Sequence, residues 1–215
     1  MSGTSSIPLS HAAPLPDRRR VLGSLVASAA LSLTGCAPAA GPALAFHGLD
    51  VSGAPYARDF SLTDCHGQHR SLTDFRGQVV MLYFGFVQCP DVCPTALTRA
   101  AAVMEQLGPQ AAQLQVIFIT VDPERDTPEL LRDYMAAFHP AFLALTGSAG
   151  DIRRTADEFR VHYQKVSTGS SYTMDHTALT YLFDRRGRIR VVLRHEQSAE
   201  EHAADVRTLL AEPVA

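Results

Sequence analysis

The fold is decided by residues 79–94, which read VVMLYFGFVQCPDVCP. The first six residues are a continuous apolar run rich in β formers, a pattern typical of a strand buried on both faces. Cys89 and Cys93 follow this run, and a proline comes directly after each of them. A helix is predicted from Pro94 to Leu107, so the two cysteines stand at a constrained turn between a strand and a helix.

The spacing of these cysteines suits two kinds of chemistry. At the N-terminus of a regular helix, residues four positions apart lie on one face with Cα atoms about 6 Å apart. This separation fits a disulfide, which spans roughly 4.4 to 6.8 Å, and also a pair of thiolates that share one metal ion. The positive end of a helix lowers the pKa of a thiol and favours the reactive thiolate. Redox chemistry and metal binding therefore remain open for Cys89 and Cys93, beside the alternative of two inert buried cysteines.

Strands and helices alternate along the rest of the chain. A second buried strand is predicted at residues 116–121, and Thr127 with Pro128 has the pattern of a helix start. The spacing of a serine and an acidic residue three positions later predicts two further helix starts, at Ser148 and Ser198. The remaining predicted elements are a strand at 143–146, an N-terminal hairpin at 58–62 and 69–72, and a second hairpin at 178–184 and 189–193. Together they predict an α/β fold in which helices flank a mixed central sheet.

Composition limits the classes of function. A chain of 215 residues with 46% hydrophobic and 19% charged residues is typical of one soluble folded domain. Its formal net charge of -3 supplies no basic footprint for a nucleic-acid backbone. With no tryptophan and 7% aromatic residues, the chain also lacks a base-stacking platform. We therefore expect no nucleic-acid partner.

The N-terminal region has the pattern of an export signal. Three arginines at 18–20 precede an uncharged apolar run at residues 21–33. This run is too short for a membrane-spanning helix, which needs about 20 residues. The run ends Leu-Thr-Gly before Cys36, which resembles the lipobox of bacterial lipoproteins, where the cysteine is acylated and cleavage occurs just before it. The consecutive arginines also resemble a twin-arginine signal, so the export route stays open between the general secretory and twin-arginine routes.

These patterns divide the chain into three parts. We predict a signal peptide at 1–35, a lipid-anchored linker at 36–57 and the folded domain at 58–212. Acylation of Cys36 would anchor the protein to a membrane of the bacterial cell envelope, with the domain facing the periplasm or the exterior.

Three blocks of sequence resemble the SCO/SenC family. They are residues 83–94, residues 121–128 with the sequence VDPERDTP, and residues 175–177 with the sequence DHT. The resemblance runs in order from about residue 58 to 212. It implies a thioredoxin-like fold, a copper ion held by two cysteines and one histidine, and a role in assembling the copper A centre of cytochrome c oxidase.

The resemblance assigns Cys89, Cys93 and His176 as the copper ligands. Copper(I) accepts two thiolates and an imidazole, and copper(II) also gains from the nitrogen donor, so such a site suits either state. Zinc is the competing metal, but a structural zinc site takes four protein ligands. A supporting role that orients the imidazole or tunes the site is predicted for Asp175. Asp122 and Asp126, which could suggest a hard-metal or acid-base pair, are interpreted as residues that shape a loop.

The alternative function is that of an extracytoplasmic thiol-disulfide oxidoreductase, which would use Cys89 and Cys93 to reduce cysteines of the copper-site subunit. Thioredoxins separate their cysteines by two residues instead of three, and they place a proline where this chain has Met174 to Thr177, so the pattern favours a metal. The expected partners are the copper-site subunit of the oxidase and other copper chaperones or thioredoxin-like reductants. Cys65 is interpreted as an inert turn residue, with a free thiol or an intermolecular bridge as the alternatives.

Overall fold

The computed structural model describes residues 45–213. The predicted signal peptide and Cys36 lie outside the described residues. At the centre is β4 (Val79–Gly85), the strand predicted from the apolar run, in which all residues are buried. It pairs in parallel with β5 (Leu114–Thr120) and antiparallel with β9 (Thr180–Phe183). Because the core lies on both faces of β4, the residues that follow this strand start from a rigid support.

The central sheet is mixed and has eight strands in the order β1-β10-β9-β4-β5-β6-β2-β3. The predicted hairpins are confirmed, since β2 pairs antiparallel with β3 and β9 with β10. The outer strands β1 and β3 have two residues each. The strands not yet given are β1 (Leu49–Asp50), β2 (Leu62–Asp64), β3 (His69–Arg70), β6 (Leu143–Thr146) and β10 (Ile189–Leu193).

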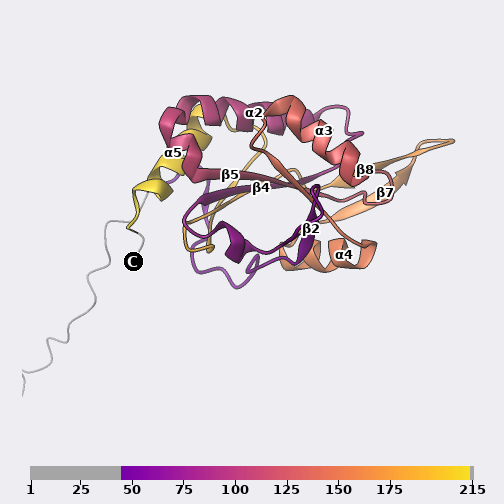
Figure 1. Ribbon diagram of the computed structural model, residues 1–215, viewed down its shortest axis with the longest axis horizontal. Coiled ribbons are helices and arrows are strands. Elements are labelled where there is room, and N and C mark those ends of the chain that lie inside the picture. Colours follow the sequence, from indigo (N-terminus) through magenta and orange to yellow (C-terminus); the bar gives the residue numbers. More distant parts are fainter. Residues whose placement is uncertain (1–44, 214–215) are drawn as a thin grey trace, which may run out of the picture. The chain divides into compact units, whose positions relative to one another are not determined.

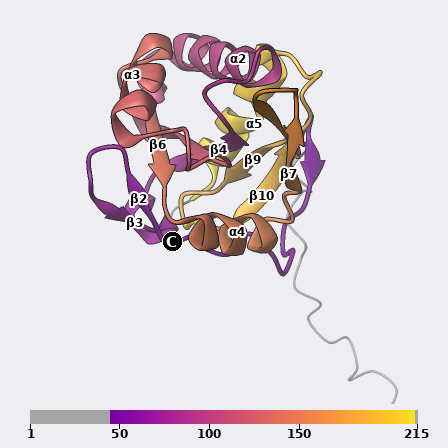
Figure 2. The same ribbon diagram turned by 90° about the vertical axis from the view of Figure 1, so that its right-hand side faces the viewer.

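The helices lie on both faces of this sheet. Figures 1 and 2 show α2 and α3 along one face, with α5 beside α2, and α4 on the opposite face. The predicted helix starts are confirmed: Thr127 caps α3 by accepting the N–H of Leu130, and Ser148 and Ser198 begin α4 and α5 with capping boxes. The helices are α2 (Val92–Leu107), α3 (Pro128–Phe138), α4 (Ala149–Glu158) and α5 (Ala199–Ala211), with short 3-10 turns η1 (Leu72–Phe75) and η2 (Gly108–Gln113).

A second, two-stranded sheet was not predicted from the sequence. It is a hairpin of β7 (Tyr163–Ser167) and β8 (Tyr172–His176), which pair with each other and with no other strand of the described residues. In β7 every residue after Tyr163 is exposed, and in β8 only Met174 is buried, so neither strand shows the regular apolar alternation of a strand with one face in the core. Figure 1 shows the hairpin extending beyond the helices at the right.

Residues 45–57, assigned to the linker by the sequence, contact the domain in the structure. Leu49 and Asp50 form β1 against β10, and Ala57 is fully buried. The backbone N–H groups of His47 and Gly48 donate to the two carboxylate oxygens of Asp205 in α5, at 2.8 and 2.9 Å. The folded part therefore begins before residue 58. Within residues 45–213, no helix combines the length and the apolar character of a membrane span.

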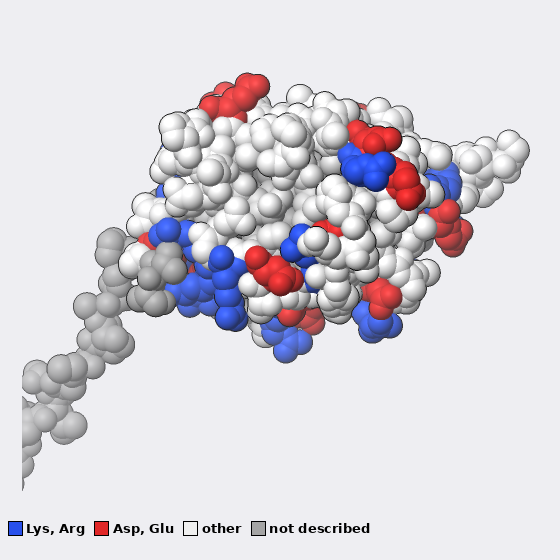
Figure 3. All heavy atoms as spheres, in the orientation of Figure 1, with Lys and Arg blue, Asp and Glu red and all other residues white. Residues whose placement is uncertain are grey.

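Acidic and basic side chains are interspersed on the face of the molecule shown in Figure 3, and the area over α2 is largely uncharged. Ion pairs at the surface of the domain include Arg58 with Glu158 and Lys165 with Glu124. Such exposed pairs contribute little to stability, roughly 0 to 1 kcal/mol each. The fold is held mainly by its buried apolar core.

Candidate metal centre

The two cysteines lie where β4 passes into α2. Cys93 is the second residue of α2 and is completely buried, whereas Cys89 belongs to the turn before the helix and is 9% exposed. The prediction that both cysteines occupy one face of the helix is therefore wrong. Asp91 stands at the N-cap without a capping bond from its side chain, and the N–H of Cys93 instead donates to the Cys89 Sγ at 3.5 Å. The sulfur of Cys89 thus takes the place of a capping oxygen.

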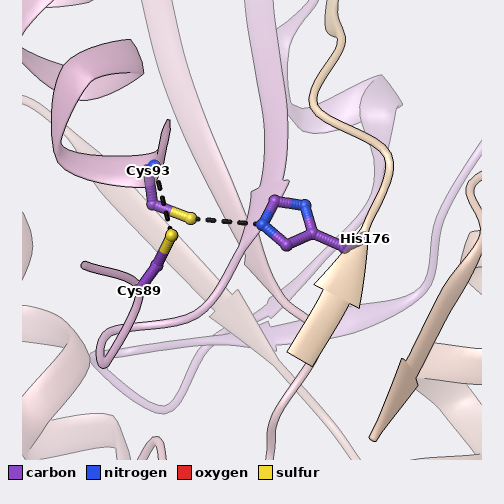
Figure 4. Close-up of side chains that lie close together, drawn as sticks. All are labelled: Cys89, Cys93 and His176. Carbon is purple, nitrogen blue, oxygen red and sulfur yellow. Dashed lines mark hydrogen bonds between the residues drawn. The ribbon is translucent and has the colours of Figure 1, made fainter. Parts of the chain in front are cut away.

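His176 approaches the cysteines from the end of β8. Its Nε2 lies 3.4 Å from the Sγ of Cys93 (Figure 4). Its Nδ1 lies 3.2 Å from the carbonyl oxygen of Thr177. If Nδ1 carries the ring proton and donates it to this carbonyl, the lone pair of Nε2 faces the sulfurs. A hydrogen bond of this kind at the far nitrogen is the usual means by which a protein orients a metal-binding imidazole.

The three side chains form one ligand group. The Sγ atoms of Cys89 and Cys93 and a ring nitrogen of His176 all lie within 4.8 Å of one another. Among residues 45–213, no other group of three or more cysteine, histidine or acidic side chains lies close enough together to bind one metal ion. Cys89 and Cys93 are not joined by a disulfide, so both sulfurs can bind a metal once their thiols have lost their protons.

Aromatic side chains and one glycine shape the walls of the group. The rings of Tyr83 and Phe86 meet the His176 ring edge to face, with centroids 6.1 and 5.8 Å away. At Gly85, a Cβ atom would lie 2.8 Å from the Cys93 Sγ and 2.7 Å from the ring of Phe118. Glycine at this position therefore leaves the space that the sulfur occupies.

A cavity of about 270 Å³ leads from the solvent to this group. Its lining includes Cys89 and His176, the apolar residues Phe86 and Met174, and the exposed Asp91. A larger cavity of about 680 Å³ lies between residues 52–58 and β10 and is lined by none of the three ligand-type residues. Solvent therefore reaches Cys89 and His176 from the side of β8, whereas Cys93 does not line the cavity.

The two thiols differ in acidity because their surroundings shift their pKa values in opposite directions. The hydrogen bond with Cys93 lowers the pKa of Cys89 to about 4, and His176 and backbone N–H groups act in the same direction against the opposing effect of burial. The hydrogen bond with Cys89, together with burial, raises the pKa of Cys93 above its ordinary value. Cys89 is therefore the more acidic of the two thiols, and Cys93 has to lose its proton when a metal binds both sulfurs.

Asp126 fixes the segment before Cys89. Its Oδ2 accepts the Thr120 hydroxyl at 2.6 Å and the Val87 N–H at 3.1 Å, and burial raises the pKa of this carboxyl. Asp122 is also buried and pairs with Arg125. Because both carboxylates are engaged by protein groups inside the fold, the structure supports their interpretation as loop-shaping residues.

Of two other predicted residues, Asp175 lines the same cavity without contacting the imidazole, and Cys65 lies apart from the site. Asp175 is exposed and has no side-chain hydrogen bond within residues 45–213, so Thr177, and not Asp175, contacts the His176 ring through a hydrogen bond. Cys65 is 4% exposed on the turn after β2, where its N–H donates to the carbonyl of Ala144. The buried thiol fits an inert turn position better than an intermolecular bridge.

Comparison with known proteins agrees with the geometry. The sequence model of the family described as SCO1/SenC matches residues 50–211. The chain belongs to the SCO1/SenC family. Its relatives in this family include the SCO2-like protein RP587 of Rickettsia prowazekii, which is 39% identical over 145 residues that cover 66% of this chain and 71% of the relative.

Similar SCO proteins occur in other organisms. The mitochondrial SCO2 homolog of Bos taurus is 41% identical over 157 residues, which are 71% of this chain and 59% of the bovine protein. The copper-bound structure of ScoI from Bradyrhizobium japonicum is 39% identical, with a TM-score of 0.66 over 71% of this chain and 98% of ScoI. The fold of the SCO1/SenC chain is therefore thioredoxin-like, as the resemblance of its motifs implied.

Proposed function

We propose that this SCO1/SenC protein binds copper through Cys89, Cys93 and His176 and delivers it during assembly of the copper A centre of cytochrome c oxidase. The observation that carries the proposal is the convergence of these three donor atoms within 4.8 Å. Support comes from the copper-bound ScoI structure and from the description of the Sco family as cytochrome c oxidase assembly proteins.

The donor set fits copper by its chemistry. Two thiolates are soft ligands that select copper(I), and the imidazole of His176 adds affinity for copper(II). Zinc prefers four protein ligands in a structural site, and only three ligand-type side chains meet here within residues 45–213. A three-ligand site in contact with a solvent cavity suits an ion that has to leave again.

Transfer would proceed by ligand exchange. A thiolate of the acceptor subunit enters through the cavity beside Cys89 and forms a bond to copper before the Cys89–copper bond breaks. The open coordination positions of a three-ligand site permit this order of steps. The copper ion is the cargo, and its oxidation state does not change in the exchange.

The second candidate function is thiol-disulfide reduction, and the lowered pKa of Cys89 favours it. The Cys89 thiolate would attack a disulfide of the copper-site subunit and form a mixed disulfide. Cys93 would then displace the target cysteine, which leaves the target reduced and a Cys89–Cys93 disulfide. A thioredoxin-like reductant would restore the two thiols.

For the location, we propose a membrane-anchored lipoprotein of the bacterial cell envelope, with an export signal at 1–35 and acylation at Cys36. Eight residues lie between Cys36 and Ala45, the first described residue, so nine Cα–Cα steps span at most about 32 Å when extended. The domain would therefore remain close to the membrane. Release of the protein by replacement of Cys36 with serine, measured by cell fractionation, tests the anchor.

Copper titration of the protein tests the metal site. We expect one equivalent of copper in the wild-type protein, a loss of affinity and a changed absorption spectrum in His176→Ala, and normal binding in His162→Ala. His162 is a matched control because its side chain is exposed at the base of the same hairpin. Identical stoichiometry, affinity and spectrum in wild type and His176→Ala would contradict the assignment of the ligand.

The two candidate functions differ in what rescues a cell without the protein. For a copper carrier, added copper restores oxidase activity and a thiol reductant alone does not. Rescue by the reductant alone would favour the reductase. Cells that carry His176→Ala provide the third arm, since a reductase retains function without the imidazole whereas a carrier loses it.

A further inference from the structure

The loop between β5 and α3 contacts both elements that carry the ligands of the metal centre. The cysteines follow β4, whereas His176 ends the separate β7–β8 hairpin. These elements do not belong to one sheet, so a further contact must set the distance between them. Arg125, in this loop, makes such a contact.

Arg125 hydrogen bonds to both sides at once. Its Nη1 donates to the side-chain oxygen of Gln88, next to Cys89, at 3.0 Å and to the backbone oxygen of Tyr172 in β8 at 2.8 Å. Its Nε donates to the carboxylate of Asp122, which orients the guanidinium. The three acceptors come from three different segments of the chain.

Tyr172 strengthens the connection to the hairpin. The guanidinium carbon of Arg125 lies 3.7 Å from the centre of the Tyr172 ring, and the Tyr172 hydroxyl donates to Asp122 at 2.9 Å. The side chain of Arg125 is only 17% exposed, so these interactions are partly shielded from water. A planar guanidinium can stack on a ring and donate at its edge together, which a lysine ammonium cannot do.

We infer that Arg125 is a positioning residue of the metal centre, which holds the Cys89 loop and the His176 hairpin at the separation needed for three-ligand copper binding. The inference rests on the proposed function, since it assigns a role within the same site. Arg125 does not touch the metal. It acts by keeping the imidazole close to the sulfurs before the ion arrives, which lowers the ordering cost of binding.

The size of the effect follows from the position of Arg125 behind the ligands. Loss of a group that orients metal ligands typically costs 10- to 100-fold in metal affinity. We expect a loss of this size in Arg125→Ala and nearly the same loss in Arg125→Lys, which keeps the charge but cannot serve the three acceptors. Gln88→Leu, which removes only the contact to the cysteine loop, should lose several-fold.

The experiment measures copper affinity of the full chain by competition with a chromophoric chelator, together with the absorption spectrum. Arg153→Ala is the matched control, because Arg153 stacks on Tyr163 of the same hairpin at 4.1 Å and makes no hydrogen bond to the cysteine loop. It should bind copper like the wild-type protein. If Arg125→Ala and Arg153→Ala both bind like wild type, the inference is overturned.

A double-mutant cycle with His176→Ala separates positioning from a general loss of structure. If Arg125 acts by placing the imidazole, Arg125→Ala has little further effect once His176 is absent. Full additivity of the two losses would overturn the inference. If Arg125→Ala does not fold, the copper affinities of Gln88→Leu and Tyr172→Phe are measured instead. Wild-type copper affinity in both variants would overturn the inference. Failure of the wild-type protein to bind copper would instead overturn the proposed function.

Discussion

The Sγ of Cys93 lies 3.4 Å from the Nε2 of His176, although 83 positions separate these residues in the sequence. The contact joins a helix start, fixed by the central sheet, to a hairpin outside that sheet. It also places a base beside a buried thiol that has to lose its proton when a metal binds. The acidity of the thiols is therefore the first property to measure.

Cys89 should react as a thiolate far below the ordinary pH range of a cysteine. Because the hydrogen bond from Cys93 lowers its pKa to about 4, its modification by iodoacetamide should remain fast from pH 8 down to about pH 5. In Cys93→Ala, which lacks this bond, the midpoint of the rate profile should move upward. Mass spectrometry of peptides distinguishes Cys89 from Cys65 and Cys93. If the rate profile of wild-type Cys89 had its midpoint near pH 8.5, the lowered pKa of this thiol would be contradicted.

Gly85→Ala should damage both stability and metal binding. The new Cβ would stand 2.8 Å from the Cys93 Sγ and 2.7 Å from the Phe118 ring, within the packed core. Overpacking of this kind costs about 1 to 3 kcal/mol, which urea unfolding can measure. Gly150→Ala in α4 is the control, since its Cβ would meet no atom closer than 3.5 Å. Equal effects of the two substitutions would show that the space beside the sulfur is unimportant.

His202 should make the fold sensitive to acid. It is 2% exposed, and burial lowers its pKa to about 4, whereas an unfolded histidine titrates near 6.5. Between these values the unfolded state binds more protons, so the free energy of unfolding falls as the pH decreases from 6.5 to 4. The contribution is at most about 3 kcal/mol.

Unfolding of His202→Gln at several pH values checks this expectation. Its stability should change less than that of the wild-type protein between pH 6.5 and 4. The exposed His66 provides the control, and His66→Gln should follow the wild-type profile. Parallel curves for wild type and His202→Gln would mean that another group dominates in this range.

Asp205→Ala should loosen the segment before β1 without affecting the metal centre. The substitution leaves the N–H groups of His47 and Gly48 without the carboxylate that accepts them. Both N–H groups are only partly buried, and the loss of such a hydrogen bond costs about 0.5 to 1.5 kcal/mol, so hydrogen exchange of residues 45–51 should accelerate. Asp50→Ala, at an exposed carboxylate, is the control. Unchanged exchange in Asp205→Ala would argue that β1 alone holds the segment.

Much of the fold could be predicted from local patterns. The continuous apolar run identifies β4 because it is short and rich in β formers, as in a strand buried on both faces. Ser148 and Ser198 mark helix starts through their own hydrogen bonds. The β7–β8 hairpin was not predicted because its strands carry no regular apolar alternation. Gly169 at its tip, with a φ of 82°, was the available turn signal.

Some residues of the site could likewise be predicted from the sequence, and others could not. The cysteine pair was apparent from its spacing, and His176 from the resemblance to the family. The role of Arg125 could not be predicted, because its acceptors at Gln88 and Tyr172 are 37 and 47 positions away. Contacts of this range depend on the tertiary fold, which single-sequence patterns do not encode. The position of Cys89 outside the helix was missed because a sulfur replaces the usual capping oxygen.

The separate pairing of β7 with β8 has a kinetic consequence. Opening of this hairpin would leave the ladder of the central sheet intact, so it should require less free energy than global unfolding. Two of the proposed donors are locked into the core, whereas the third can depart with a local fluctuation. The chain can therefore combine a stable fold with a short residence time of the bound ion. A site with all three ligands in the rigid core could not have both properties.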